Sequence, residues 1–296
     1  MTSRPGDALS PEQAFRWACC LELRALKPGN VASSRPGHDM SGRDFTLSAR
    51  RSAPWLAAPN ASLGERIYRA VAATRKAVGC NTNLGIVLLC APLLRASQQR
   101  GERPLARTVA EQIAEADRAD TDWVFRAIRL AAPGGLGEAP RHDVRGKASV
   151  ALAEAMAEAA HRDRVAREYA TDFAQVLGPG RAHLERLWQA WNSPTWATAA
   201  VFLRYLAMEP DSHVLRRHGA AVARDVTREA SRLEPRLAGA ADPRELRPDL
   251  LDLDRDLRAR GINPGTCADL AVATVCAALL EPLTAPRDAA SSARWA

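Results

Sequence analysis

The sequence predicts an all-α protein of about twelve helices, forming a single globular domain around one buried central helix. Runs of Ala, Leu, Arg and Glu carry apolar residues three and four positions apart, which is the spacing of amphipathic helices. Alternating β-branched residues are almost absent, and only 5% of residues are aromatic, which is low for an all-β core. With 296 residues, the chain is long enough to bury a large core.

Helix signals near the amino-terminal end are specific. Ser10-Pro11-Glu12-Gln13 combines a cap, a first-turn proline and a capping-box partner, and the helix it opens is expected to end before Lys27-Pro28. Ser62 and Glu65 repeat the capping-box spacing and start a helix towards Lys76. The stretch 82–97 is apolar on nearly all faces, so it is expected to be the buried central helix.

The later part of the chain continues the helical pattern. Helices are expected over 104–118, 120–132, 148–160, 161–177, 181–191, 194–208, 211–233, 247–260 and 265–281. Gly178-Pro179-Gly180 predicts a break, and the Pro-, Ala- and Gly-rich stretch 234–246 predicts a surface loop. Because apolar helices occur throughout, we expect one domain over 1–296, with a core at 10–282 and a frayed tail at 283–296.

Composition excludes several classes of protein. No run of eighteen uncharged apolar residues exists, and the first residues lack the apolar stretch of a secretory signal. The net charge of +7 comes mostly from arginines interleaved with acids, without a basic tail, so nucleic acid is not an expected partner. The six cysteines form no C-x-x-C pair and suit a reducing compartment. We expect a cytoplasmic protein with a mild preference for anionic ligands.

The first segment whose side chains could bind a ligand or take part in a reaction is a short loop after the first helix. Lys27 offers a charge suited to phosphate, Gly29 allows close backbone approach, and Asn30 adds a neutral donor and acceptor. His38 and Asp39 follow as a titratable pair. The structural alternative is an ordinary interhelical loop in which Asp39 or Ser41 caps the next helix.

The second segment holds Gly79, Asn81, Thr82 and Asn83 directly before the apolar helix. Backbone amides at a helix start bind anions, and small residues allow a ligand to come close. The chain contains neither G-x-x-x-x-G-K-[ST] nor G-x-G-x-x-G, so this is no Walker or Rossmann loop. The structural alternative is that Asn81 or Thr82 merely caps the helix.

Two further segments lie in the carboxyl-terminal third. Asp211 and Arg217 place an acid and a guanidinium within two turns, although a plain capping role for Asp211 is a strong alternative. Asn263 and Gly265 form a small-residue turn before an apolar helix that contains Asp269. A lone carboxylate on such a helix is costly unless a cation or donors meet it, which favours a metal or substrate role for Asp269.

Taken in order, these segments resemble the triphosphoribosyl-dephospho-CoA synthase family. Its motifs are a K-P-G loop with a histidine–acid turn, a G-x-N-T-x-x-G loop, D-[ST] with R-x-G, and a P-G-x-x-A-D-L turn. The matching residues here are Lys27-Pro28-Gly29, Gly37-His38-Asp39-Met40, Gly79–Gly85, Asp211-Ser212, Arg217-His218-Gly219, Asn263-Pro264-Gly265 and Ala268-Asp269-Leu270. The resemblance covers roughly 12–282.

The resemblance implies an ATP-dependent transferase that joins the triphosphoribosyl group of ATP to 3′-dephospho-CoA and releases adenine. From residue chemistry, Lys27, Arg217 and the helix start at Asn81 are expected to meet the phosphates together with Mg²⁺. Asp39 and Asp269 are candidates for holding the metal or stabilising an oxocarbenium-like carbon, and His38 is the first candidate for proton transfer.

Departures from the family pattern leave the acceptor open. Asn83-Leu84 stands where members that supply the prosthetic group usually have His-Lys, and Thr266-Cys267 replaces Gly-Ser. One alternative is an enzyme of the same fold acting on another cofactor intermediate in methanopterin-type one-carbon metabolism. Another is a non-catalytic nucleotide-binding helical protein. The oligomeric state is also open, with a homodimer as one alternative.

Overall fold

The computed structural model describes residues 9–32 and 40–281, and these contain thirteen α-helices, a π-helical turn, a 3₁₀ turn and no β-strand. The expected tail at 283–296 lies outside them. In chain order the elements are α1 (Pro11–Arg24), α2 (Gly42–Leu56), α3 (Leu63–Val78), α4 (Leu84–Gln99), α5 (Leu105–Glu115), α6 (Arg118–Ala131), α7 (Leu152–Ala159), α8 (Arg164–Ala170), η1 (Val176–Gly180), α9 (Arg181–Trp191), α10 (Pro194–Met208), α11 (Ser212–Gly239), η2 (Pro243–Leu246), α12 (Arg247–Ala259) and α13 (Gly265–Leu280). The all-α prediction is confirmed.

Side-chain caps fix helix starts where the sequence predicts them. Ser10 Oγ accepts a hydrogen bond from the Gln13 amide, and the Gln13 side chain accepts one from the Ser10 amide at 2.8 Å, which completes the capping box of α1. Ser62 Oγ accepts from the Glu65 amide and also donates to the Asp120 carboxylate at 2.5 Å. This serine therefore caps α3 and ties it to α6.

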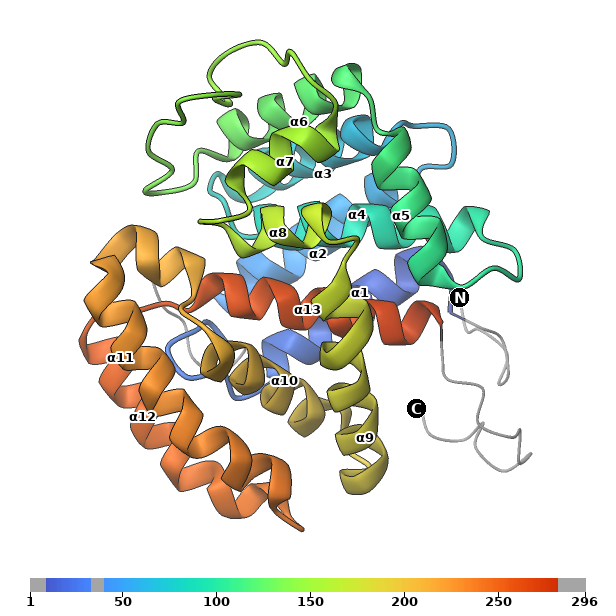
Figure 1. The fold of residues 1–296 in the computed structure, drawn as a ribbon. Coiled ribbons are helices and arrows are strands. Elements are labelled where there is room, and N and C mark those ends of the chain that lie inside the picture. Colours follow the sequence, from blue (N-terminus) through green and yellow to red (C-terminus); the bar gives the residue numbers. More distant parts are fainter. Residues whose placement is uncertain (1–8, 33–39, 282–296) are drawn as a thin grey trace.

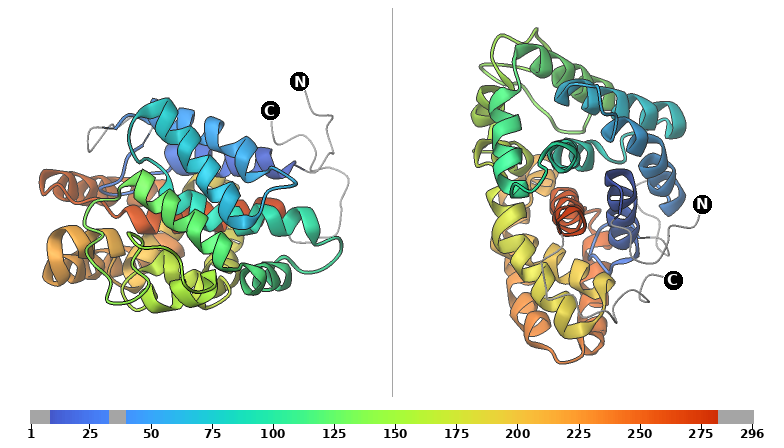
Figure 2. Two further views of the ribbon diagram at one scale, coloured as in Figure 1. Left: turned by 90° about the horizontal axis from the view of Figure 1, so that it is seen from above. Right: turned by 90° about the vertical axis from the view of Figure 1, so that its right-hand side faces the viewer.

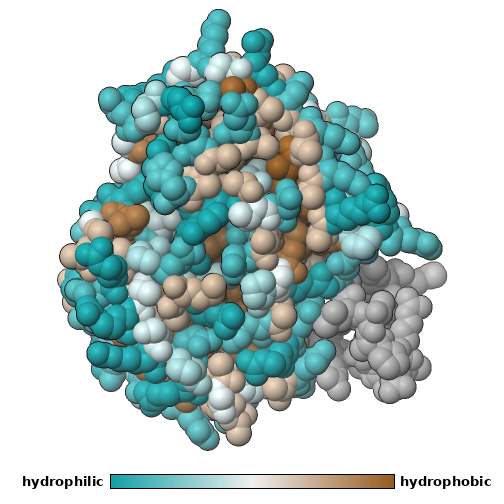
Figure 3. Space-filling view, in the orientation of Figure 1, coloured by the Kyte–Doolittle hydropathy of each residue, from teal (hydrophilic) through white to brown (hydrophobic). Residues whose placement is uncertain are grey.

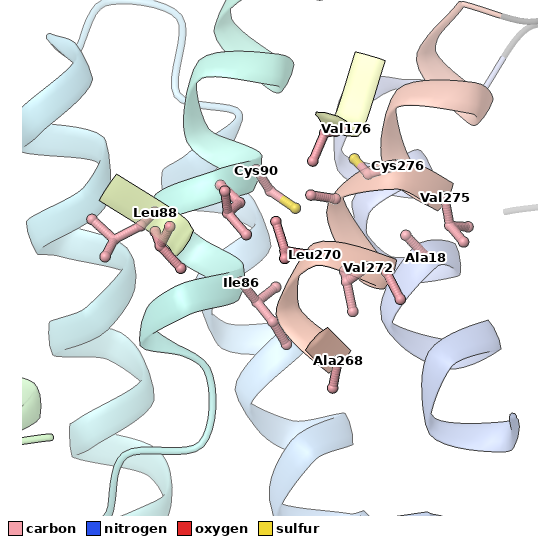
Figure 4. Close-up of a cluster of buried hydrophobic side chains, with 14 of the residues drawn as sticks. Ala18, Ile86, Leu88, Cys90, Val176, Ala268, Leu270, Val272, Val275 and Cys276 are labelled. Carbon is pink, nitrogen blue, oxygen red and sulfur yellow. The ribbon is translucent and has the colours of Figure 1, made fainter. Parts of the chain in front are cut away.

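Two apolar helices occupy the centre of the molecule. The predicted central helix, α4, is buried on most sides, and α13 packs beside it. Seen end-on, α13 is enclosed by α1, α4 and α10 (Figure 2). At the contact between the two helices, Ile86 and Cys90 of α4 face Leu270 of α13 (Figure 4). One contiguous cluster of buried apolar residues extends from this centre through α1 to α13.

The other helices cover this centre in two groups. α2, α3 and α6 pack together, with α3 and α6 above α4 in Figure 1, and α10 and α11 pack together, with α10 below α13. α11 is interrupted at Gly219, which has a φ of +83°, so its first turns point in a different direction from the rest. A long loop between α6 and α7 lies at the upper left of Figure 1.

The surface is mainly hydrophilic. Figure 3 shows polar side chains over most of one face, with apolar side chains recessed near its middle. Among the described helices, none combines the length and the low charge that a membrane span requires.

Two sequence-based expectations about element boundaries are wrong. The expected helix over 161–177 stops at Ala170, because Asp172 and the fully buried Phe173 adopt left-handed backbone with φ of 52° and 61°. The expected loop over 234–246 is largely helical, since α11 continues through Pro235 to Gly239. Burial of Leu237 outweighs the backbone hydrogen bond that a proline removes.

Candidate active site

A cavity of about 910 Å³ lies where α4, α8, α11 and α13 begin. Leu84 and Gly85 line it from the first turn of α4, and Gly265 and Thr266 line it from the first turn of α13. Neither helix has a capping side chain at its N-cap position. Two helix starts that carry partial positive charge thus face one space of the size that small-molecule sites have.

Another part of the cavity wall is more apolar. It is formed by side chains of α2, α6 and α7 and by the loop that follows α6. Its apolar lining residues are Phe45, Val124, Phe125, Ile128, Leu136, Leu152 and Met156. The cavity therefore offers a polar end at the helix starts and an apolar end that suits a flat base or an aliphatic chain.

The cavity joins segments that are far apart in the sequence. The predicted site residues that line it are Asn30, Asn81, Thr82, Asn83, Arg217, Asn263, Gly265 and Asp269. The first and last of these segments are hydrogen-bonded to each other, because Asn30 Nδ2 donates to Asn263 Oδ1 at 2.8 Å. Four predicted site residues, Lys27, Gly29, Gly79 and Asp211, are not part of the lining.

Lys27 lies behind the cavity wall and is 1% exposed. Its ammonium group donates to the Glu22 carboxylate, to Asn30 Oδ1 at 2.5 Å and to the Val31 carbonyl at 2.8 Å. All three donors of the ammonium are therefore used inside the protein. Burial lowers the pKa of Lys27, while Glu22 acts to raise it.

Asp211 and the two glycines shape the backbone around the cavity. Asp211 Oδ1 caps α11, and its Oδ2 accepts a hydrogen bond from the Cys267 amide at 2.7 Å, which fixes the start of α11 against the start of α13. The capping alternative for Asp211 is thus observed. Gly29 has a φ of +77°, and a Cβ there would lie 2.7 Å from the Ile262 carbonyl oxygen. Gly79, with a φ of +74°, ends α3.

Asp269 is the one residue between Thr266 and Ala278 of α13 that is not fully buried, and it faces the cavity. Its carboxylate forms no hydrogen bond or ion pair with any described residue. Burial, and then the negative charge of Glu22, raise its pKa well above the ordinary value. A Cβ at Gly85 would lie 2.1 Å from Asp269 Oδ2, so α4 can approach this carboxylate only because residue 85 is glycine.

Glu22 is a cavity residue that the sequence analysis missed. It lies in the last turns of α1, is 3% exposed and lines the cavity. Burial raises its pKa, and the neighbouring Lys27 acts to lower it. The available signal was an acid on the buried face of α1 five residues before Lys27, but an ion pair of this kind becomes visible only when the chain is folded.

Hydrogen bonds to α2 and to the start of α4 fix the polar loop before α4. Asn81 Oδ1 accepts a hydrogen bond from the first backbone amide of α4 at 3.1 Å, so its predicted capping alternative is observed. Thr82 Oγ1 bonds to Ser48 Oγ at 2.6 Å, and Asn83 Nδ2 donates to Ser52 Oγ at 3.3 Å. These bonds to α2 fix the loop while all three residues still line the cavity.

Positive charge reaches the cavity from α11. Arg217 is an exposed lining residue with no hydrogen bond or ion pair to any described residue. Its Nη1 lies close to the loop after α6, where a Cβ at Gly134 would be 2.8 Å away. The two remaining predicted residues, His38 and Asp39, lie outside the described residues.

No group of three or more His, Cys, Asp or Glu side chains that could hold a metal occurs in the part of the chain that the structure describes. Glu22 and Asp269 nevertheless line the same cavity. Mg²⁺ commonly takes one or two carboxylates from the protein and completes its shell with substrate phosphates and water. The donor set at the polar end therefore fits a magnesium ion that arrives with a polyphosphate.

Comparison with known protein families decides the assignment. The family model for ATP:dephospho-CoA triphosphoribosyl transferase (CitG) matches residues 8–287, which is nearly the whole chain. The chain belongs to this family. The family predicted from the motifs is thus confirmed, and with it an ATP-dependent transferase of the triphosphoribosyl-dephospho-CoA synthase type.

A solved structure agrees with this family assignment. The chain is similar to a crystal structure from Archaeoglobus fulgidus that carries the provisional name triphosphoribosyl-dephospho-CoA synthase. The two share 25% sequence identity and a TM-score of 0.62, covering 80% of this chain and 98% of the other. A comparison with curated proteins gave no match.

Proposed function

We propose that this protein transfers the triphosphoribosyl group of ATP to the 2′-hydroxyl of 3′-dephospho-CoA inside the cavity described above. In this reaction the hydroxyl oxygen forms a bond to C1′ of the ATP ribose and the bond from C1′ to adenine breaks. The hydroxyl loses a proton and adenine gains one, so that free adenine leaves. Family membership supports the reaction type.

The observation that carries this proposal is the convergence of the family motifs on one cavity. Asn81, Arg217, Asn263 and Asp269 are distant in sequence and yet line the same space. The starts of α4 and α13, whose N-cap residues make no side-chain cap bond, face that space as well. Helix starts and a guanidinium without an internal partner suit a triphosphate, and a carboxylate suits the positive charge that develops at C1′.

Asp269 is the proposed stabiliser of the reacting carbon. A glycosyl carbon that loses its base passes through an oxocarbenium-like state, which a carboxylate in a poorly solvated site stabilises strongly. No described residue forms a hydrogen bond or ion pair with the Asp269 carboxylate that would compete for this role. His38 is retained as the proposed proton donor to adenine, and Asp39 as a further carboxylate of the site.

Mg²⁺ is part of the proposal. Asp269, together with Glu22 or Asp39, would hold the ion, and when bound it neutralises charge on the triphosphate. Lys27 is proposed to act on the site through Glu22, whose carboxylate it holds at the cavity wall. Gly29, Gly79 and Asp211 are proposed to shape the loops that surround the substrate.

The test is release of adenine. Purified protein is incubated with ATP, Mg²⁺ and 3′-dephospho-CoA, and free adenine is measured by chromatography. We expect release that requires both dephospho-CoA and Mg²⁺ and that is lost with EDTA. Tight ATP binding without turnover on any acceptor would contradict the proposal and favour a non-catalytic binding protein.

A second candidate differs only in the acceptor, and a local observation favours testing it. Leu84 lines the cavity and Asn83 is hydrogen-bonded to Ser52, so this corner offers no imidazole or ammonium where many relatives have them. This corner of the cavity is therefore less cationic than in those members, which would alter recognition of the nucleotide or of the acceptor. A panel of acceptors that includes pterin-type cofactor intermediates separates this candidate from dephospho-CoA.

The setting of the reaction is also a proposal. All six cysteines are free thiols, which supports a cytoplasmic location. Small-molecule substrates account for the cavity, and neither nucleic acid nor a membrane is part of the proposal. A homodimer is tested by light scattering of the purified protein.

A further inference from the structure

An ion pair fastens the start of α8 to α11 beside the cavity. Asp163 Oδ1 caps α8, and Asp163 Oδ2 bonds to Arg216 Nη1 at 2.5 Å. The next residue adds a second link, because the Arg164 amide donates to Ser212 Oγ at 3.0 Å. The pieces of chain on either side of this pair therefore have a fixed position relative to each other.

Each partner of the ion pair has an arginine as its sequence neighbour. Arg162 precedes Asp163 and Arg217 follows Arg216, and both arginines line the cavity. Neither guanidinium group forms a hydrogen bond or ion pair with any residue that the structure describes. Two guanidinium groups without internal partners thus face one cavity from two elements that are held together.

The two acids that lie close to Arg162 in the chain, Asp163 and Glu158, are already bonded to other arginines. Asp163 is paired with Arg216, and Glu158, one turn before Arg162, is paired with Arg141 at 2.5 Å. The cavity therefore holds four lining arginines, of which Arg141 and Arg216 are neutralised by partners in the protein. An anionic ligand is the natural partner for the two that remain.

We propose that Arg162 and Arg217 together grip the triphosphate of ATP, one guanidinium from each side of the Asp163–Arg216 pair. Planar guanidinium groups bind phosphate oxygens through two parallel hydrogen bonds, and two such groups at a fixed spacing match a chain of phosphates better than a single phosphate. Arg216 of this pair and Asp269 line the same cavity.

The experiment measures binding of inorganic tripolyphosphate by calorimetry. R162A and R217A are each expected to bind it about tenfold to hundredfold more weakly than the wild type, as for loss of a hydrogen bond to a charged group. R186A is the matched control, because Arg186 is an exposed arginine of α9 away from the cavity. R162K keeps the positive charge and is expected to bind tripolyphosphate more tightly than R162A does. A purely structural role of Arg162 would not explain this recovery.

Binding by R162A within about twofold of the wild type and the R186A control overturns the inference. The inference rests on the proposed function only for the identity of the ligand as ATP, since tripolyphosphate binding needs no turnover. Normal adenine release by R162A together with unchanged binding contradicts the inference alone. Binding that depends on Arg162 without adenine release from ATP and dephospho-CoA contradicts the proposed function alone.

Discussion

Asp269 combines two properties that normally exclude each other. Its carboxyl group lies on the most buried helix of the molecule, and no described residue neutralises it. The raised pKa shows that the folded protein resists the charged form. A residue that lowers stability and is nevertheless placed at the cavity is typical of a catalytic group.

Replacing Asp269 with asparagine is expected to separate activity from stability. D269N should lose at least about 100-fold in adenine release, because the developing positive charge loses its partner. The variant should be as stable as the wild type or more stable at neutral pH. Folding raises the pKa of this carboxyl group, so the group lowers the stability of the protein as the pH increases above its ordinary, unfolded-state pKa. Asparagine cannot ionise, so the variant does not have this loss of stability.

The measurement is thermal unfolding from pH 4 to 8 beside the turnover assay. E115Q is the matched control, because Glu115 is an exposed acid of α5 outside the cavity. A D269N protein with wild-type turnover would remove Asp269 from the mechanism. A Tm of D269N that falls with pH as steeply as that of the wild type would show that the carboxylate is not penalised by burial.

Lys27 and Glu22 form a buried pair in which each charge depends on the other. K27M is expected to lower the free energy of unfolding by about 3–5 kcal/mol, because it leaves the Glu22 carboxylate buried without its partner. The loss should grow as pH rises, since folding raises the pKa of Glu22. Urea unfolding at pH 5 and pH 8 measures both effects.

The double variant E22Q/K27M tests the cause of this loss. It should recover part of the stability, because no unpaired charge is left, while adenine release stays low because the cavity lacks the Glu22 carboxylate. If the double variant is no more stable than K27M, the loss arises from packing around the lysine stem.

At the scale of elements, the site depends on how closely α4 approaches α13. G85A places a Cβ 2.1 Å from Asp269 Oδ2, so the carboxylate must move away. We expect turnover to fall about 100-fold, as for a displacement of roughly 1 Å in a catalytic group. G239A is the control, because a Cβ at this helical glycine of α11 meets no atom within 4 Å. Equal turnover of G85A and G239A would contradict the close approach.

The sequence predicts individual elements well when one strong local signal dominates. The complete capping box at Ser10 and the uniformly apolar 82–97 gave correct helices. The loop predicted around Pro235 is in fact helical, because the helix there is stabilised by burial of Leu237 against other parts of the chain. The residues of this stretch alone do not predict that contact.

In the candidate site, too, some features follow from the local sequence and others depend on contacts between distant segments. Small-residue turns at Asn81 and Asn263 mark cavity walls, since they are required locally for close approach. Spacing alone does not reveal which charged groups meet when the helices pack. The ion pair of Lys27 with Glu22, and the lack of a partner for the Arg162 guanidinium among the described residues, become visible only in the folded chain. The motifs therefore mark several walls of the cavity, and the fold determines which charged groups near it have partners.

At the scale of the whole molecule, ligand binding at the junction of four helix starts is expected to stabilise the fold. ATP at 100 times its dissociation constant should add about 2.7 kcal/mol to the free energy of unfolding. A thermal shift assay checks this, with AMP as the control because it lacks two phosphates. A shift with AMP as large as that with ATP would show that the phosphate chain contributes little to binding.

The position of α13 also has a consequence for how the protein is made. It comes last among the described helices, yet α1, α4 and α10 all pack around it. During synthesis these helices leave the ribosome before the helix that fills their common centre, so a partly made chain keeps apolar faces open to solvent. Asp269 arrives on that same helix. The chain thus gains this cavity carboxylate only in the step that closes its core, and a partly synthesised copy lacks one wall of the cavity.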